Sequence, residues 1–371
     1  MNVLITGAAG FLGRNLAAWL RTRPDCRVLE FDREHPWEAL AKGLDQADFV
    51  FHLAGINRPE TEQEFFTGNV GLTEQICDHL LRRTQPVPLV LSSSIQATLD
   101  NPYGRSKAAA EMVVVNYARL SGAYTCIYRL ANVFGKWSRP NYNSVVATFC
   151  YNIARDLPIA ISDPARILTL VYVDDVMRHF MGELDAASQA GSVQQCTAGP
   201  TAQITLGELA AQLQQFRAVR STLRMPNFGD PFVGKLYATY LAYLPEEDFA
   251  YALDRKCDAR GCLAEFLKLP AFGQLFVSRT ASGVTRGNHY HHTKTEKFLV
   301  LEGEAVVRFR RLDCEAVIEY RVAGTDMRVV DIPPGYTHSL QNIGEGELIT
   351  LFWSSEIFDQ AQPDTCFLPV I

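Results

Sequence analysis

The chain has 371 residues, 47% of them hydrophobic and 20% charged, with a formal net charge of -6. Length and composition predict a globular protein of roughly two or three domains. Lysine and arginine are scattered along the chain rather than gathered into a basic stripe, so we do not expect nucleic acid as a partner. Apolar runs stay short of the roughly 18 residues that a membrane span requires, so no membrane partner is expected either.

The cysteines and the first residues indicate a cellular compartment. The nine cysteines are odd in number and dispersed, without a Cys-x-x-Cys pair, which is typical of reduced thiols. The stretch from Met1 to Gly7 lacks a basic region and enters a strand pattern at once, so we expect no signal peptide. Both features predict a cytoplasmic protein.

Short apolar strands alternate with helical stretches in the first half of the chain. This alternation predicts a Rossmann-type α/β fold, a parallel sheet with helices on both faces. The strand-like segments are 2–6, 27–31, 48–53, 89–92 and 125–130, and the helical segments include 12–21, 70–83 and 106–120.

The pattern changes near Leu244–Glu247. From Phe276 onward the expected strands are short and separated by glycine and proline, which predicts an all-β barrel or sandwich. We therefore expect one domain over residues 1–247 and a second over 248–371. The expected strands of the second domain include 298–301, 305–310, 317–322, 328–332 and 348–353.

A glycine-rich loop follows the first strand and opens the first helix. Gly7 allows the tight turn, Gly10 lets the backbone approach a pyrophosphate, and Gly13 permits close packing of the helix. Phe11 and Leu12 lie at the start of that helix, whose free N–H groups and positive dipole end attract phosphate. The loop predicts a dinucleotide cofactor.

Asp32 and Arg33 follow the second strand, where residues that distinguish NAD from NADP usually lie. An acid here bonds the ribose hydroxyls of NAD, whereas an arginine can pair with the 2′-phosphate of NADP. Both residue types are present, so these positions alone leave both cofactors open.

Tyr103 and Lys107 are four residues apart and would share one face of a helix. An ammonium beside a phenol favours the phenolate, so we expect Lys107 to lower the pKa of Tyr103 and allow proton exchange near neutral pH. Ser92, Ser93 and Ser94 end the preceding strand, where a hydroxyl could polarise a substrate carbonyl.

A second constellation lies in the C-terminal third of the chain. His289 and His291 alternate along an expected strand, so their imidazoles point the same way. Glu296 can approach from the next strand and His338 from a third. Three imidazoles and a carboxylate suit Zn(II), Fe(II), Mn(II), Ni(II) or Cu(II), so the donor set predicts a divalent metal without choosing it.

Residues 1 to about 245 resemble an extended short-chain dehydrogenase/reductase. The matching pieces are GAAGFLG, His52–Gly55, Asn69 in GNVGLT, SSS, YGRSK, Arg129–Gly135 and Val171–Val176. One departure is Leu168-Thr169, where an Arg-Asp pair is common in the family.

The resemblance implies a role for each matching residue. Tyr103 would be the proton donor, Lys107 would hold the ribose, and Ser94, with Ser93 as the alternative, would orient the carbonyl. Asn69 would position the active-site backbone. The cofactor would lie against the glycine loop and Leu53, Ala54 and Gly55. The resemblance also favours NADP(H) and a nucleotide-linked sugar as substrate.

The C-terminal third resembles a cupin, a jelly-roll barrel. The spacings Gly-x5-His-x-His-x4-Glu-x6-Gly and Pro-x-Gly-x2-His-x3-Asn match its two motifs, although Met327 replaces a glycine that often opens the second. The resemblance implies a single metal ion, zinc first, on His289, His291, Glu296 and His338. His292 lies off the ligand-facing side and is expected not to bind.

The chain as a whole resembles bifunctional capsular-polysaccharide synthesis enzymes that join a reductase to a cupin. The resemblance implies a UDP-linked 2-acetamido-2,6-dideoxy-4-hexulose as substrate. The cupin would epimerise C3 and the reductase would then reduce C4 with NADPH. The product would be UDP-N-acetyl-6-deoxy-L-talosamine, on the route to UDP-N-acetyl-L-fucosamine. The cupin base is left open among Tyr290, Lys294, Lys297 and Tyr336.

Two other interpretations are compatible with the sequence. The chain could be a single-activity reductase whose cupin binds metal or mediates dimerisation, or a sensor that binds NAD(P) without catalysis, since a fold does not fix a function. Because extended reductases and cupins both commonly pair, a homodimer is expected.

Overall fold

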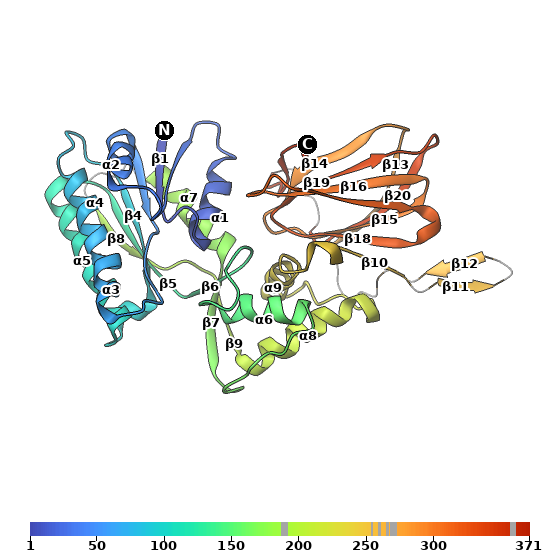
Figure 1. Ribbon diagram of the computed structural model, residues 1–371, viewed down its shortest axis with the longest axis horizontal. Coiled ribbons are helices and arrows are strands. Elements are labelled where there is room, and N and C mark those ends of the chain that lie inside the picture. The colour runs from blue at the N-terminus through green and yellow to red at the C-terminus, as the bar shows by residue number, and fades with distance from the viewer. Residues whose placement is uncertain (187–191, 254, 259–260, 265–266, 268–272, 357–360) are drawn as a thin grey trace. The chain divides into compact units, whose positions relative to one another are not determined.

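A computed structural model describes residues 1–186, 192–253, 255–258, 261–264, 267, 273–356 and 361–371 (Figure 1). The chain divides into two compact units. Unit 1 comprises Met1–Ser144 and Leu168–Gln203, and unit 2 comprises Val145–Ile167 and Ile204–Ile371. The chain therefore crosses between the units three times. The domain boundary expected after residue 247 stays a prediction.

Unit 1 is built on a parallel sheet of six strands in the order β2-β1-β3-β4-β5-β8. The order and the parallel pairing confirm the predicted Rossmann-type fold. The strands are β1 (Asn2–Thr6), β2 (Arg27–Phe31), β3 (Phe49–His52), β4 (Leu89–Ser94), β5 (Thr125–Leu130) and β8 (Val193–Cys196).

Helices connect these strands, and a smaller sheet of three strands in the order β6-β7-β9 follows. The helices are α1 (Phe11–Leu20), α2 (Trp37–Gln46), α3 (Glu62–Phe66), α4 (Leu72–Leu80), α5 (Pro102–Ser121) and α7 (Val173–Ala186), with a π-helical turn at Thr67–Gly71 and a 3-10 turn at Ile95–Thr98. The small sheet consists of β6 (Asn132–Phe134), β7 (Ile167–Tyr172) and β9 (Thr201–Thr205).

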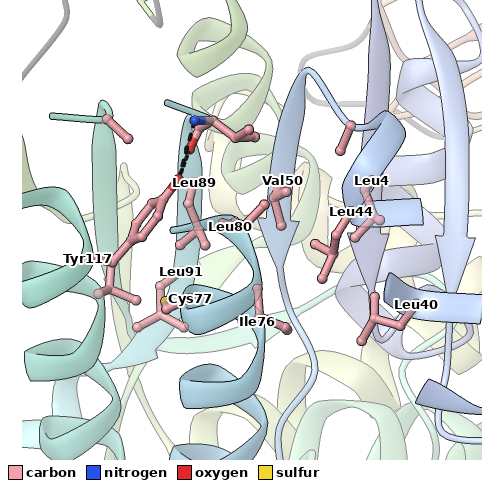
Figure 2. Packing of buried hydrophobic residues seen from close by; sticks show 14 of the residues in the cluster. Leu4, Leu40, Leu44, Val50, Ile76, Cys77, Leu80, Leu89, Leu91 and Tyr117 are labelled. Atoms are coloured by element: carbon pink, nitrogen blue, oxygen red, sulfur yellow. Dashed lines mark hydrogen bonds between the residues drawn. The ribbon is translucent and has the colours of Figure 1, made fainter. Parts of the chain in front are cut away.

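The central strands of unit 1 are buried along their whole length, as expected when helices cover both faces of a parallel sheet. On one face, strand residues Leu4, Val50 and Leu89 pack against Ile76 and Leu80 of α4 (Figure 2). At the edge of this cluster, the Tyr117 hydroxyl donates a hydrogen bond of 2.7 Å to the Val87 carbonyl. This packing fixes the strands and leaves the loops after them to carry polar groups.

Unit 2 contains a helical part and two antiparallel sheets. The helices are α6 (Val145–Ala154), α8 (Leu206–Thr222) and α9 (Pro231–Leu241), followed by a 3-10 turn at Glu246–Asp248. The two five-stranded sheets, called the barrel below, have the orders β10-β18-β15-β20-β13 and β17-β16-β19-β14-β21. Strands β11 and β12 form a separate hairpin. This antiparallel all-β arrangement is that of the expected cupin-like domain.

Strands β15, β18 and β19 of the barrel are buried along most of their length, and Phe298, Val307 and Leu340 are among the buried side chains. The strands are β10 (Ala250–Ala252), β11 (Arg255–Asp258), β12 (Gly261–Ala264), β13 (Gln274–Thr280), β14 (Thr285–Tyr290), β15 (Glu296–Glu302), β16 (Glu304–Arg311), β17 (Val317–Ala323), β18 (Arg328–Ile332), β19 (Tyr336–Asn342), β20 (Leu348–Ser354) and β21 (Cys366–Phe367), with a 3-10 turn at Gly324–Asp326.

The helical part of unit 2 packs on the outside of the barrel. Phe228 lies 5.4 Å from Trp353 between ring centroids, and the Arg220 guanidinium of α8 lies 3.0 Å from the Asp331 carboxylate of β18. Among the described residues, every helix is too short or too polar to cross a membrane.

Candidate active site and metal centre

The glycine loop of unit 1 is shaped by close backbone contacts. Gly7 has a φ of +70°, and a Cβ there would lie 2.9 Å from the Ala54 Cα. A Cβ on Gly13 would lie 2.1 Å from the Gly7 carbonyl oxygen. These two positions therefore require glycine, and the loop lies directly against the segment Leu53–Gly55. The first turn of α1, with Phe11 and Leu12, begins immediately after Gly10.

Asp32 lies beside the same loop. One carboxylate oxygen accepts a 2.8 Å hydrogen bond from the Ala9 amide, and the other accepts one of 2.9 Å from the Arg33 amide. The Arg33 side chain is exposed. The structure thus brings the predicted cofactor residues together at the carboxyl ends of β1, β2 and β3, where doubly wound sheets bind dinucleotides.

Asn69 is buried and ties the loop after β3 to helix α5. Its amide oxygen accepts a hydrogen bond of 2.8 Å from the Ile56 amide, and its amide nitrogen donates to the Ile56 carbonyl at 3.0 Å and to the Ser106 hydroxyl at 2.9 Å. The Leu53 amide donates to the Thr6 carbonyl at 3.2 Å. The loop after β3 is therefore fixed at both ends.

Helix α5 places Tyr103 in its first turn. The Asn101 side chain caps the helix by accepting a 2.8 Å hydrogen bond from the Gly104 amide, and Pro102 occupies the first helical position. The Tyr103 ring lies 5.6 Å from the Phe65 ring between centroids. The cap and this contact orient the phenol at the start of the helix.

The structure distinguishes the two candidate serines. The Ser93 hydroxyl donates a 2.5 Å hydrogen bond to the Glu111 carboxylate, which also pairs with Arg129 at 2.6 Å. The Ser94 hydroxyl accepts a 3.1 Å hydrogen bond from the Gln96 amide and lies close enough to the Tyr103 phenol to lower its pKa. Ser94 is therefore the serine that faces Tyr103, whereas Ser93 belongs to a structural ion-pair cluster.

The pKa of Tyr103 differs from expectation. Burial raises it, and the Ser94 hydroxyl only partly offsets that effect. The Lys107 ammonium donates a 2.7 Å hydrogen bond to the Ser92 carbonyl. The predicted lowering of the Tyr103 pKa by Lys107 is therefore wrong for this structure. Burial also lowers the pKa of Lys107 to about 8, with an opposing effect from Glu111. Near neutral pH the phenol thus keeps its proton.

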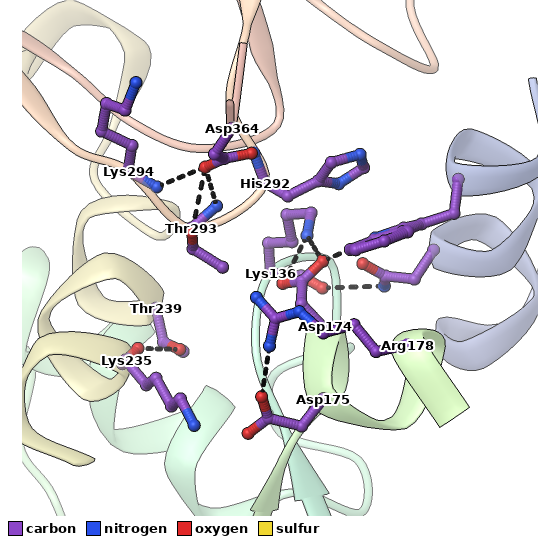
Figure 3. A network of polar contacts seen from close by, with 12 residues as sticks. Lys136, Asp174, Asp175, Arg178, Lys235, Thr239, His292, Thr293, Lys294 and Asp364 are labelled. Atoms are coloured by element: carbon purple, nitrogen blue, oxygen red, sulfur yellow. Dashed lines mark hydrogen bonds and ion pairs between the residues drawn. The ribbon is translucent and has the colours of Figure 1, made fainter. Parts of the chain in front are cut away.

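An ion pair that we did not predict lies in the same unit. The Lys136 ammonium contacts both carboxylate oxygens of Asp174, at 2.6 and 2.7 Å, and both side chains are fully buried (Figure 3). The Trp19 indole donates to Asp174 at 2.9 Å. Asp174 belongs to the Val-Tyr-Val-Asp-Asp stretch that contributes to the family resemblance. That stretch was the sequence signal that could have pointed to Asp174. The pair fixes the start of α7 against β6.

The four predicted metal ligands converge in the barrel. Ligand atoms from His289, His291, Glu296 and His338 all lie within 4.8 Å of one another. The His291 and His338 Nε2 atoms lie 3.4 and 3.5 Å from one oxygen of Glu296. Within the described chain, neither Nε2 atom makes a hydrogen bond although both are buried. Buried nitrogen lone pairs aimed at a carboxylate fit a divalent cation, so the residues present suit a metal.

The ligands strongly affect one another's pKa. Burial alone raises the pKa of Glu296, but the His291 and His338 imidazoles outweigh burial and hold it well below its usual value. Burial lowers the pKa of His289 to about 4, and the two other histidines add to this effect. Burial also lowers the pKa of His338, whereas at His291 burial is outweighed by the Glu296 carboxylate, which raises the pKa. Neutral imidazoles and an ionised carboxylate are the protonation states that bind metal.

A segment near the C-terminus supports the ligand loop and was not predicted as part of the site. The Asp364 carboxylate accepts hydrogen bonds of 2.8 Å from the His292, Thr293 and Lys294 amides (Figure 3). The Asp364 carbonyl accepts a hydrogen bond from His291 Nδ1, which directs Nε2 towards the other ligands. Asp364 lies in the terminal stretch that carried part of the resemblance, but spacing gave no sign of its role.

The structure separates the four candidate bases. Lys297 lies 2.5 Å from the Asp331 carboxylate, and the charge of Asp331 outweighs burial to raise its pKa. Burial and Glu246 raise the pKa of Tyr336. Lys294 donates to the Thr365 hydroxyl at 3.2 Å, and Tyr290 is buried near His292. Lys297, fixed as a cation, is therefore a poor base.

The chain matches two described families. Residues 3–194 match the NAD dependent epimerase/dehydratase family, and residues 256–366 match the polysaccharide biosynthesis C-terminal domain. A curated relative from Pseudomonas aeruginosa, UDP-2-acetamido-2,6-beta-L-arabino-hexul-4-ose reductase, is 46% identical over 366 residues, 98% of each chain.

The chain is also similar to solved structures. The capsular polysaccharide assembling protein CapF from Staphylococcus aureus is 44% identical, with all of both chains covered and a TM-score of 0.67. A UDP-glucuronic acid 4-epimerase from Bacillus cereus, solved with UDP-glucuronic acid and NAD, is 19% identical and covers 58% of this chain and 83% of its own, with a TM-score of 0.53. The second likeness concerns the fold alone.

Proposed function

The chain belongs to the NAD dependent epimerase/dehydratase family, and from this premise we propose that it is an NADPH-dependent reductase of a UDP-linked 4-keto sugar. The substrate is a UDP-2-acetamido-2,6-dideoxy-4-hexulose, because the Pseudomonas aeruginosa relative is named for reducing such a sugar. The observation that carries the proposal is the position of Tyr103, half-buried in the first turn of α5 beside Ser94, at the same sheet edge as the glycine loop.

Tyr103 is the proton donor of the reduction. When bound, the nicotinamide supplies the hydride that C4 receives. The C4 oxygen gains negative charge as the hydride arrives, and a neutral phenol can then give it a proton. A raised Tyr103 pKa suits this direction of reaction because the acid must begin protonated. The ketone thus becomes an alcohol with one hydride and one proton.

Ser94, Lys107 and Asn69 prepare this transfer. The Ser94 hydroxyl can donate a hydrogen bond to the ketone oxygen, which polarises the carbonyl. Lys107, charged below its pKa of about 8, would hold a cofactor ribose beside Tyr103. Asn69 fixes the loop after β3, so that Gly55 and Ile56 keep their places.

The choice of NADPH is supported by Asp32 and Arg33. The Asp32 carboxylate is already bonded to the Ala9 amide of the loop, whereas the neighbouring residue Arg33 is exposed. An exposed guanidinium pairs well with the 2′-phosphate that distinguishes NADPH from NADH.

The barrel would epimerise C3 before reduction. His289, His291, Glu296 and His338 would hold one zinc ion, which when bound would polarise a substrate oxygen and lower the pKa of the neighbouring C–H. The C3 proton is acidic only while C4 is a ketone, so epimerisation must come first. The product would be UDP-N-acetyl-6-deoxy-L-talosamine. We assign no base, although Lys297 is disfavoured by its pairing with Asp331.

The direct experiment is incubation of the protein with the UDP-4-keto sugar and NADPH. We expect NADPH oxidation and a product that NMR identifies as inverted at C3 and reduced at C4. A product reduced at C4 with C3 unchanged would limit the function to reduction. If several UDP-4-keto sugars caused no NADPH oxidation, the reductase proposal would be wrong.

A further inference from the structure

Two cysteines and a glutamate meet in unit 1. Cys126 comes from β5, Cys196 from β8 and Glu183 from α7. The two sulfur atoms lie 3.1 Å apart, and the sulfurs and a Glu183 oxygen all lie within 4.8 Å of one another. Cys126 is fully buried and Glu183 is 7% exposed, whereas Cys196 is half-buried. Potential metal-binding atoms thus converge from three elements.

The carboxylate of Glu183 is held in a fixed orientation. Tyr124 and Tyr128 donate 2.5 Å hydrogen bonds to its two oxygens, one to each. Tyr124 directly precedes β5, and Cys126 and Tyr128 follow at every second residue along it, so the three side chains share one face of the sheet. Hydroxyl donors that orient a carboxylate in this way are typical of the partners that surround metal ligands.

The strand register disfavours a disulfide between the two cysteines. Cys126 is the Cα partner of Gln194 on β8, and Cys196 is the partner of Tyr128 on β5, so the cysteines are two residues out of register. With strands about 4.8 Å apart and a rise of about 3.3 Å per residue, their Cα atoms lie roughly 8 Å apart. A disulfide requires less than about 7 Å.

The local charge favours a cation. The Glu183 carboxylate lies beside both thiols, with its oxygen and the two sulfurs within 4.8 Å of one another. A metal ion is attracted by the carboxylate and displaces the thiol protons when it binds.

We propose that Cys126, Cys196 and Glu183 form a second metal site, selective for a thiophilic divalent ion such as zinc. Binding releases one proton from each thiol and forms two sulfur–metal bonds and one oxygen–metal bond. Two bonds of about 2.3 Å at a tetrahedral angle place the sulfurs ~3.8 Å apart, so the side chains must separate slightly from 3.1 Å.

The site would fasten an edge of the main sheet. Strand β8 is the last strand in the order and pairs with β5. A bound ion would join β5, β8 and α7 at one point. This role is independent of the reaction proposed above, because it involves neither the glycine loop nor the barrel.

The test is titration of the reduced, metal-free protein with Co(II), followed by absorption. We expect two equivalents per chain and a near-ultraviolet sulfur-to-cobalt charge-transfer band, which the nitrogen and oxygen ligands of the barrel cannot produce. Cys196→Ser should abolish the band and one equivalent. The double variant His289→Ala, His338→Ala should lose the other equivalent and keep the band.

Cys26→Ser is the matched control, because Cys26 is half-buried in unit 1 like Cys196 but lies outside the metal cluster. It should keep the band. Cys196→Ser is preferred to Cys126→Ser because its half-buried position makes misfolding less of a concern. The proposal is overturned if the band is absent, if it survives Cys196→Ser, or if both thiols of the metal-free protein join in a disulfide in air.

Discussion

Different forces set the protonation states of the candidate active site in unit 1 and of the metal cluster in the barrel. Burial dominates in the first, and the charges of neighbouring side chains dominate in the second. In unit 1, Lys107, Asn69 and Ser94 bond mainly to backbone groups, and burial dominates the pKa of Tyr103. In the barrel, the ligands face one another, and the histidines outweigh burial at Glu296.

This difference has a physical consequence. A single change in the first site removes one chemical step and leaves its neighbours in place, because each side chain is held by backbone. A single change in the second site alters the charge state of the remaining ligands, because they stabilise one another. We expect kinetic effects from the first site and linked effects on metal binding and protonation from the second.

The largest effect is expected from Tyr103→Phe. Without the phenolic proton donor, kcat for reduction should fall by about 100- to 10,000-fold, the usual contribution of a general acid. Cofactor affinity should stay within a fewfold of wild type, because the glycine loop is unchanged. Stopped-flow NADPH oxidation and fluorescence titration of NADPH measure the two quantities. A kcat near that of wild type would remove Tyr103 from the proton transfer.

The next effect concerns the support of the metal cluster. Asp364→Ala removes the carboxylate that binds three amides of the ligand loop, so zinc affinity should fall by about 10- to 100-fold. Competition with a chromogenic chelator measures the affinity. Glu302→Gln, an exposed change on the same strand as Glu296, is the control and should have no effect. Equal zinc affinities for Asp364→Ala and wild type would show that Asp364 does not support the metal ligands.

Buried His52 sharpens the comparison, since it bonds to the Thr6 and Thr73 hydroxyls rather than to a carboxylate. Burial, with a smaller effect of Lys107, lowers its pKa from 6.5 to about 3. Below pH 6.5 the unfolded chain therefore binds a proton that the folded chain refuses. Stability should fall from pH 6.5 towards pH 3, by about 2 kcal/mol at pH 5.

The measurement compares the free energy of unfolding of wild type and His52→Gln at pH 7.5 and pH 5.0. The difference between the two proteins cancels the titration of the barrel histidines. We expect wild type to lose about 2 kcal/mol more than the variant. The same loss in both proteins would mean that His52 does not carry this pH dependence.

The smallest effect separates the two serines. Ser94→Ala should lower kcat by roughly five- to tenfold, the loss of a hydrogen bond worth about 1–1.5 kcal/mol. Ser93→Ala should leave kcat within twofold and lower stability instead, because it removes a donor from the buried Glu111. Steady-state kinetics and thermal unfolding distinguish the two. If Ser93→Ala lost activity while Ser94→Ala did not, the assignment would be reversed.

Local spacing explains what the sequence could predict. The glycine loop, the Tyr103–Lys107 pair and the His289–His291 pair each lie within one short segment. The structure places Tyr103 and Lys107 on α5 and His289 on β14, whereas His291 lies directly after that strand rather than on it. The sequence also predicted that Glu296 and His338 reach the same site, because Glu296 belongs to the first cupin motif and His338 to the second.

Features that depend on burial or on distant partners could not be predicted. Ser93 and Ser94 are adjacent, and only the contact with Glu111 distinguishes them. The direction of the Tyr103 pKa depends on burial, which the spacing to Lys107 does not reveal. The Cys126–Cys196 contact joins residues 70 positions apart, and their strand pairing had to be known first.

Deuterium incorporation at C3 tests most directly the claim that two separate sites act on one ketone. The UDP-4-keto sugar is incubated in deuterated water without NADPH, and NMR and mass spectrometry follow C3. The account predicts incorporation by zinc-loaded wild type and by Tyr103→Phe, but not by the double variant His289→Ala, His338→Ala. Absence of exchange in wild type, or unchanged exchange in the double variant, would contradict it.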